Sequence, residues 1–175
     1  MSRTKNKMKR RYLSATLMCL CLFFSMASTA QDLNLKTLEG NATSLSNQLS
    51  KTMWTLVMVW TTYCGECAKQ YDEISAFHQS NKKFRLRVLG VSLDGLNQRT
   101  KVRQYARIKN HTFPSVLAES ENFSNKYKEL TGAPFTGTPT YMLFDRGQSI
   151  QAYMDGPISI DALERFIDQS GQSKG

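Results

Sequence analysis

The feature that most constrains the fold is an apolar run that leads into a pair of cysteines. Residues 53–60 are apolar, aromatic or β-branched and lie between polar residues, which predicts a buried central strand. The sequence Cys64-Gly65-Glu66-Cys67 follows after a short gap. The next apolar residues recur at helical spacing and predict a helix over about 65–80: Ala68, Tyr71, Ile74 and Phe77. The cysteines are therefore expected where a buried strand passes into a helix.

Shorter segments predict the remaining elements of a single α/β domain over residues 31–175. Hairpins are expected over 32–49, around Gly40-Asn41, and over 140–154, around Arg146-Gly147. Further strands are expected at 84–93 and 112–117. Further helices are expected at 97–109, at 122–130 before Gly132, and from 160 after the capping residue Ser159, with a polar tail from about 169. Strands that alternate with helices, together with the late hairpin, predict a mixed sheet flanked by helices.

The first thirty residues have the layout of a secretory signal peptide. Six basic residues precede an apolar run over 13–27, and the small residues Ser28, Thr29 and Ala30 follow it. A membrane-spanning helix needs about 20 apolar residues, so a signal cleaved after Ala30 is favoured over a retained membrane anchor, which stays the alternative. We therefore expect a periplasmic or otherwise exported protein that is soluble after cleavage.

Removal of residues 1–30 changes how charge and cysteine content are interpreted. The formal charge of the whole chain is +9, but the remainder holds 17 basic and 14 acidic residues, a formal charge of +3. Most of the net positive charge therefore comes from the signal peptide. Because the remaining domain is only weakly basic, nucleic acid is not expected as a partner. Cys19 and Cys21 are lost with the signal, which leaves Cys64 and Cys67 alone in an oxidising compartment.

The position of the cysteine pair predicts redox chemistry. A thiol at the start of a helix faces unpaired backbone N–H groups and the positive end of the helix dipole, which stabilise the thiolate. Cys64 is therefore expected to be the nucleophile, and Cys67, one turn later, the resolving thiol. A static disulfide would close too short a loop to stabilise the fold much. A zinc site would need His78 and His111, whose spacings match no compact finger pattern, so neither metal nor cofactor is expected.

Two motifs resemble those of a known family. Residues 59–67, which include Trp60, Tyr63 and both cysteines, resemble the active site of thioredoxins, particularly the exported TlpA/ResA-like thiol-disulfide oxidoreductases. Gly137-Thr138-Pro139-Thr140 resembles the cis-proline loop of that family. The likeness covers about 32–168 and implies a thioredoxin fold with an N-terminal hairpin extension and a central insert over about 94–130. It also implies that Thr138-Pro139 lies against Cys64 and that the Thr138 backbone pairs with an extended client segment.

The chain departs from the family pattern at three positions. Gln70 and Asp72 replace a frequent glutamate and proline after the second cysteine, and Met58 replaces the buried acid of thioredoxin. The proton relay attributed to such acids is thus absent or supplied elsewhere, with Glu66, Asp72 and Glu73 as candidates. Because Glu66 stands beside Cys64, it should disfavour the thiolate and raise the pKa of that thiol, which favours a reductant over a strong oxidant.

The residues around the dithiol leave some interpretations open. Trp60 and Tyr63 are candidate contacts for extended clients, although Trp60 is equally compatible with the core. Three arginines share one face of the 97–109 helix and form either a docking face for an acidic partner or a solvated face: Arg99, Arg103 and Arg107. We assign no function to either histidine.

The leading function is reduction of disulfides in exported client proteins, with electrons returned by a membrane thiol donor. Cytochrome c maturation is one such role in the family. A thiol peroxidase is a second hypothesis, because Thr61-Thr62-Tyr63-Cys64 fits a pattern of peroxiredoxins, although Val57 stands where those proteins have proline. A redox-inert module that holds a partner strand beside Pro139 is the third.

Overall fold

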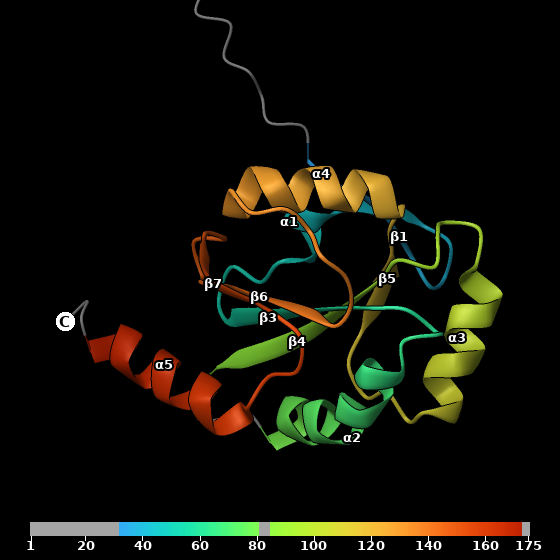
Figure 1. Ribbon diagram of the computed structural model, residues 1–175. Helices are drawn as coiled ribbons and strands as arrows, with labels where there is room; N and C mark the ends of the chain where they lie inside the picture. The colour runs from blue at the N-terminus through green and yellow to red at the C-terminus, as the bar shows by residue number, and fades with distance from the viewer. Residues whose placement is uncertain (1–31, 81–84, 173–175) are drawn as a thin grey trace, which may run out of the picture. The chain divides into compact units, whose positions relative to one another are not determined.

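The computed structural model describes residues 32–80 and 85–172 (Figure 1). The predicted signal peptide and its cleavage site lie outside the described residues, as does Phe84 at the start of one predicted strand. Over the two described ranges, no helix is both long and apolar enough to cross a membrane.

A seven-stranded mixed sheet forms the centre of the domain. Its strands, from one edge to the other, are β2 (Ala42–Ser44), β1 (Asn34–Thr37), β5 (Ser115–Leu117), β4 (Leu86–Ser92), β3 (Trp54–Trp60), β6 (Thr140–Phe144) and β7 (Ile150–Asp155). The strands β3, β4 and β5 run parallel, whereas β6 is antiparallel to β3. The two predicted hairpins are confirmed as β1–β2 and β6–β7, at opposite edges of the sheet.

The helices cover both faces of this sheet. They are α1 (Leu45–Gln48), α2 (Gly65–Ser80), α3 (Arg99–Ile108), α4 (Ser120–Thr131) and α5 (Ile160–Gln172). One core cluster joins the sheet to α2, α3 and α5, and a second joins it to α1 and α4. Figure 1 shows α4 on one side of the sheet and α2 on the other. The predicted mixed sheet flanked by helices is confirmed.

The position of β3 in the centre of the sheet explains why the apolar run at 53–60 has no alternating polar residues. All seven of its residues are buried, because helices cover both faces of the sheet. Leu56, Met58 and Trp60 pack in the core cluster between the sheet and α2. Val57 and Val59 point to the other face and pack in the cluster between the sheet and α4. The strand therefore ends with its last side chain on the face that carries α2.

Three details differ from the sequence prediction. The one-turn helix α1 follows the first hairpin directly. Ile108, which the helical pattern places in the core, is 68% exposed at the end of α3. Helix α5 continues to Gln172, past position 169 where the sequence predicts a polar tail, and the Ser170 hydroxyl donates to the carbonyl of Phe166 at 2.8 Å within its last turns. The predicted end of α4 at Gly132 is confirmed, and Gly132 adopts a left-handed conformation with φ of 74°.

Candidate functional site: a dithiol at a helix N-terminus

Cys64 and Cys67 form a disulfide at the start of α2, with their Cα atoms 5.2 Å apart. The Cys67 backbone N–H donates to Cys64 Sγ at 3.0 Å, and the Cys64 carbonyl accepts the N–H of Ala68 at 3.1 Å. Cys64 Sγ therefore accepts a backbone N–H of the first turn of α2, an interaction that favours a thiolate after reduction. Cys64 is 9% exposed and Cys67 is fully buried, so Cys64 is the more accessible of the two.

The loop between β3 and the dithiol is fixed by Asp94, which follows the end of β4. The Asp94 carboxylate accepts the Thr62 N–H at 2.9 Å and the Thr62 hydroxyl at 2.5 Å. It also accepts the Ser92 hydroxyl at 2.8 Å and pairs with Lys101 Nζ at 3.2 Å. Burial raises the pKa of Asp94, but the bonds from Thr62, Ser92 and Lys101 outweigh burial, so the pKa lies below its usual value.

The Thr138–Pro139 peptide bond is cis. Strand β6 begins directly after it, and Thr140 pairs with Val59 in the register of β3 and β6. Extending this antiparallel register by one residue places Pro139 level with Trp60, at the end of the sheet where the dithiol loop begins. The structure therefore brings the two predicted motifs to one end of the sheet, while a direct contact of Pro139 with Cys64 stays a prediction.

Asp155 anchors the Pro139 loop to its surroundings. Its carboxylate accepts the hydroxyls of Thr136 at 2.8 Å, Thr140 at 3.2 Å and Tyr127 at 3.2 Å. In addition, the Gly156 N–H donates to the Pro139 carbonyl at 2.8 Å. No local pattern in the sequence marks Asp155, because its partners lie in two other segments, α4 and the loop around Pro139. Asp94 offers a weak signal, as an acid that directly follows a buried strand.

The two aromatic residues expected to contact clients have opposite environments. Trp60 is fully buried, and its ring packs on Tyr105, with centroids 6.0 Å apart, and on His111, at 4.9 Å. Of the two interpretations that the sequence leaves open for Trp60, client contact and core, its complete burial supports the core. Tyr63 is 78% exposed, although it directly precedes the poorly exposed Cys64. Its ring remains available to a client.

The two histidines make structural contacts. His78 Nδ1 accepts the Val88 N–H of β4 at 3.1 Å, and burial, together with Arg87, lowers the pKa of His78. His111 packs between aromatic rings, with its centroid 3.9 Å from that of Tyr71, and burial lowers the pKa of His111 to about 4.

The three candidates for a proton relay, and the two positions where the family's acids are replaced, fall into three environments. Glu66 pairs with Lys69 at 2.6 Å on the exposed face of α2, and Asp72 and Glu73 are also exposed. Met58 is fully buried in the core. Gln70 is 7% exposed and bonds to the loop before α5 rather than to either cysteine: its Nε2 donates to the Ile158 carbonyl at 2.8 Å, and its Oε1 accepts the Ile158 N–H at 3.0 Å.

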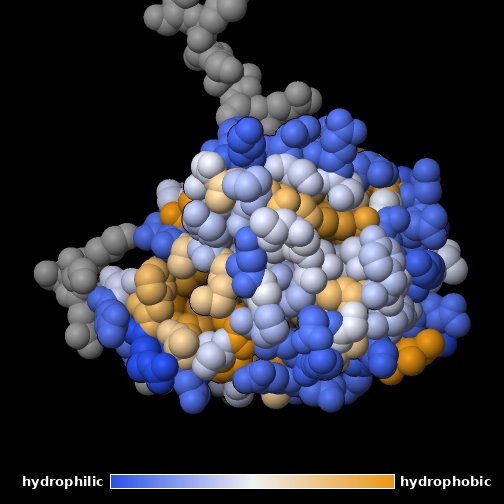
Figure 2. Space-filling model, viewed as in Figure 1, coloured by the Kyte–Doolittle hydropathy of each residue, from blue (hydrophilic) through white to orange (hydrophobic). Residues whose placement is uncertain are grey.

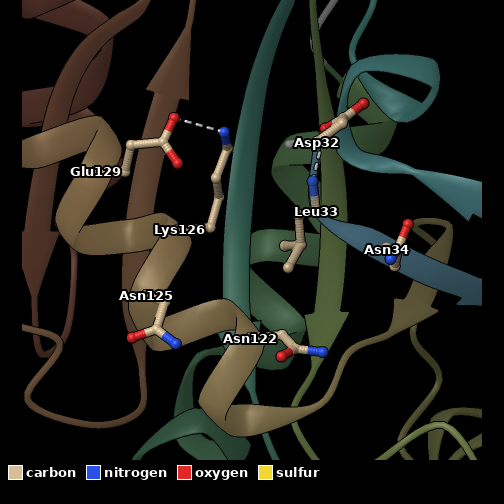
Figure 3. Close-up of a pocket in the computed structure, with 7 residues that line it drawn as sticks. All are labelled: Asp32, Leu33, Asn34, Asn122, Asn125, Lys126 and Glu129. Atoms are coloured by element: carbon tan, nitrogen blue, oxygen red, sulfur yellow. Dashed lines mark hydrogen bonds and ion pairs between the residues drawn. The ribbon is translucent and has the colours of Figure 1, made fainter. Parts of the chain in front are cut away.

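Two cavities lie on other parts of the domain. A polar pocket of about 290 Å³ lies between the start of β1 and α4. Figure 3 shows Asp32, Leu33 and Asn34 on one side of it, and Asn122, Asn125 and the Lys126–Glu129 ion pair on the other. An apolar pocket of about 380 Å³ lies between α5 and the β6–β7 hairpin, and Figure 2 shows an apolar hollow there. Neither cavity is lined by a cysteine, so the dithiol lies outside both pockets.

Comparisons with known proteins agree with this geometry. Residues 26–153 match the model of the AhpC/TSA family. The sporulation thiol-disulfide oxidoreductase A of Bacillus subtilis is 24% identical over 136 residues, which cover 77% of each chain. The crystal structure of StoA from B. subtilis, 23% identical, superposes with a TM-score of 0.59 over 77% of this chain and 95% of StoA.

Two further solved structures share the fold at lower identity. A thiol:disulfide interchange protein of the thioredoxin family from Chlorobium tepidum is 16% identical, with a TM-score of 0.62 over 79% of this chain and 92% of that one. A secreted disulfide oxidoreductase of Mycobacterium tuberculosis is 13% identical, with a TM-score of 0.59 over 79% and 96%. The chain therefore belongs to the AhpC/TSA family and is a thiol-disulfide oxidoreductase with the thioredoxin fold.

Proposed function

We propose that this oxidoreductase reduces disulfides of client proteins outside the cytoplasm. The observation that carries the proposal is the asymmetry of the cysteine pair. Cys64 is the accessible sulfur at the N-terminus of α2, and Cys67 is fully buried behind it. In this arrangement Cys64 Sγ can react with sulfur atoms of other proteins, whereas Cys67 Sγ can react only with Cys64.

The reaction begins from the reduced dithiol. The Cys64 thiolate attacks one sulfur of a client disulfide, the client S–S bond breaks, and the released client thiolate takes a proton from water. Cys67 then loses its proton and attacks Cys64 Sγ, which breaks the mixed disulfide and frees the second client thiol. The client gains two electrons and the protein becomes the Cys64–Cys67 disulfide. A thiol donor must then return two electrons, and we propose one in the membrane.

The client is proposed to bind as an extended segment beside the cis proline. The client segment would form an added strand by hydrogen bonds to the backbone of Thr138, just before the start of β6 and next to the exposed ring of Tyr63. The cis Thr138–Pro139 bond and the position of Pro139 level with Trp60 support this placement. Main-chain pairing suits clients of different sequence.

The direction of electron flow is proposed from Glu66. Its charge, one position from Cys67 and two from Cys64, disfavours a thiolate and makes the dithiol a better donor. The exposed ion pair with Lys69 offsets part of this effect. We expect a reduction potential well below that of the strongly oxidising catalysts of the periplasm, about −120 mV. A measured potential close to that value would reject the reductant assignment.

Trapping of the mixed disulfide tests the proposal directly. Cys67→Ser removes the resolving thiol, so clients should accumulate as disulfides on Cys64 that reductant releases and mass spectrometry identifies. The double variant with Cys64→Ser is the control and should yield none. Apocytochrome c among the adducts would assign a role in cytochrome c maturation. Absence of adducts with Cys67→Ser in the native host compartment would contradict the proposal.

The two alternative functions give different results. Thr61, three residues before Cys64, is buried and its hydroxyl has no hydrogen-bond partner among the described residues, which is the observation that favours a peroxidase. Consumption of peroxide by the reduced protein faster than reduction of a peptide disulfide would support that function. A redox-inert binding module would instead retain its biological role after Cys64→Ser.

Export is proposed from the first thirty residues. The predicted cut after Ala30 would give a mature chain that begins at Gln31. N-terminal sequencing of the protein recovered from its native compartment tests this: a chain that retains residues 1–30 in the membrane fraction would support the anchor instead.

A further inference from the structure

The surface beside the dithiol carries a lysine in a fixed position. Lys101 Nζ lies 3.2 Å from Asp94 Oδ1 and 5.9 Å from the centroid of the Tyr63 ring. Asp94 is the residue that also binds Thr62, so Lys101 is tied to the same loop that presents Cys64. An ammonium over an aromatic face gains a further electrostatic attraction. Lys101 is therefore placed by the active-site loop.

The two side chains of this ion pair differ in their exposure to solvent. The side chain of Asp94 is 1% exposed, whereas that of Lys101 is 55% exposed. The carboxylate is already satisfied by Thr62 and Ser92 on its inner side. A molecule that approaches the dithiol therefore meets the ammonium and the Tyr63 ring, and not the carboxylate.

Lys101 belongs to a segment that is rich in basic residues. The segment 97–109 holds five basic residues and no acidic residue: Arg99, Lys101, Arg103, Arg107 and Lys109. Arg99 and Arg103 donate to carbonyls of the β1–β2 turn, on another side of α3. Lys101 is thus the basic residue of α3 that contacts the active-site loop. On α2, the exposed ion pair with Lys69 offsets part of the negative charge of Glu66.

We propose that Lys101 selects clients that carry a carboxylate close to the cysteine that Cys64 attacks. The Tyr63 ring packs against the apolar part of the same client segment, and the ammonium attracts the acidic side chain. This inference rests on the proposed reduction of client disulfides and names the class of client: segments in which Asp or Glu stands next to the reactive cysteine.

The test uses three cyclic peptide disulfides that differ in a single residue next to one cysteine. This residue is Glu, Gln or Lys. The second-order rate constant for reduction by the reduced protein is divided by that for dithiothreitol with the same peptide, because the neighbouring charge also alters the disulfide itself. At about 0.01 M ionic strength, where screening acts only beyond about 30 Å, we expect the Glu peptide to react roughly threefold faster than the Gln peptide. The Lys peptide should react roughly threefold slower.

Variants of Lys101 identify the source of this preference. Lys101→Met keeps the aliphatic stem and should bring the three normalised rates together, Lys101→Arg should keep their order, and Lys101→Glu should reverse it. Lys128→Met removes the same charge from the exposed surface of α4 and should leave the order unchanged. The wild-type preference should also vanish at about 1 M salt, a measurement that does not depend on how a variant folds.

The outcomes separate this inference from the proposed function. If the wild-type protein reduces none of the peptides, the proposed function fails together with the inference. If it reduces all three at equal normalised rates, or if Lys101→Met keeps the wild-type order, thiol-disulfide exchange stands and the role of Lys101 is overturned.

Discussion

Gln70 joins α2 to the segment before α5 through a side chain that both donates and accepts. Its Oε1 accepts the Tyr141 hydroxyl at 2.7 Å in addition to the Ile158 N–H, while its Nε2 donates to the Ile158 carbonyl. A carboxylate has the same shape but no donor at neutral pH. The replacement of the family's frequent glutamate by glutamine therefore has a structural reason in this chain.

Gln70→Glu should destabilise the fold at neutral pH. The ionised variant would leave the Ile158 carbonyl without its donor and would bury a charge, at a cost of about 1–3 kcal/mol. Burial raises the pKa of such a carboxyl in the folded state, so the loss should shrink as the pH falls toward about 4, where the protonated group can donate. Urea unfolding at several pH values measures this. Asp72→Asn, on the exposed face of α2, is the control, and equal losses for both variants would contradict the role of Gln70.

His111 should make stability depend on pH in a defined window. Its pKa is lowered from 6.5 to about 4 in the folded protein, so the unfolded chain binds the proton more readily. The contribution of neutral His111 is complete above about pH 6.5 and is lost as the pH falls toward about 4. With allowance for its partial exposure, the loss is about 2 kcal/mol.

His111→Phe keeps an aromatic ring among Trp60, Tyr71 and Phe113 and removes the titration. The difference in unfolding free energy between wild type and variant should therefore shift in favour of the variant between about pH 6.5 and 4. Denaturant titrations at several pH values across this range measure the two unfolding free energies. The contributions of the other titratable groups are the same in both proteins and cancel when the free energies are subtracted. A constant difference would show that the ring does not titrate in this window.

At the scale of the elements, β4 approaches its neighbours closely at Gly90. A Cβ there would lie 2.4 Å from Ser115 Oγ, 2.8 Å from Trp60 Nε1 and 3.1 Å from Phe113. The absent side chain lets the end of β5 and the Trp60 ring pack against β4. The space that Trp60 occupies below the dithiol loop thus depends on a glycine in the neighbouring strand.

Gly90→Ala should destabilise the protein by about 1–3 kcal/mol, because three core side chains must move to admit one methyl group. Thermal or urea unfolding measures the effect. Gly65→Ala is the matched control, since nothing lies within 4 Å of its Cβ position and α2 accepts alanine there. If both variants were equally stable, the close packing around Gly90 would not be a determinant of stability.

The elements differ in how well the sequence predicts them. Strand β3, helix α2 and both hairpins were predictable, because their apolar spacing and turn residues act locally. The exposed Ile108 was not, because its environment depends on how the last turn of α3 lies against the rest of the domain. In the site, the cysteines and Pro139 stand in recognisable motifs, whereas the anchoring role of Asp94 arises only when β3 and β4 are paired.

At the scale of the whole domain, the site joins segments that are far apart in the chain. The pairing of β3 with β6 sets the Cys64 loop and the Pro139 loop at one end of the sheet, and each loop has its own acidic anchor. Asp94 holds the first through Thr62, and Asp155 holds the second through Thr136 and Thr140. If the client binds beside Pro139 as proposed, the two anchors should act on different steps: Asp94 on the attack by Cys64, and Asp155 on the binding of the client.

Asp155→Ala should slow exchange with peptide or protein clients and leave small disulfides unaffected. The hydroxyls of Thr136, Thr140 and Tyr127 would lose their common acceptor, the Asp155 carboxylate. A less ordered loop before Pro139 would align an extended client poorly, with a loss of roughly tenfold in rate. A small disulfide needs Cys64 but not the loop. Rate constants for a peptide disulfide and for a small symmetrical disulfide, measured on the same reduced protein, separate the two effects.

Tyr127→Phe removes one of these three bonds and serves as the graded comparison. It should slow peptide exchange less than Asp155→Ala, because both threonine bonds remain. If both rate constants fell together in Asp155→Ala, the substitution would have disturbed Cys64 itself, and the separation of a client anchor from a nucleophile anchor would be wrong. If only the peptide rate falls, the cis-proline loop is the part of the domain that holds the client, and its position is fixed from α4 and β7 rather than from the dithiol helix.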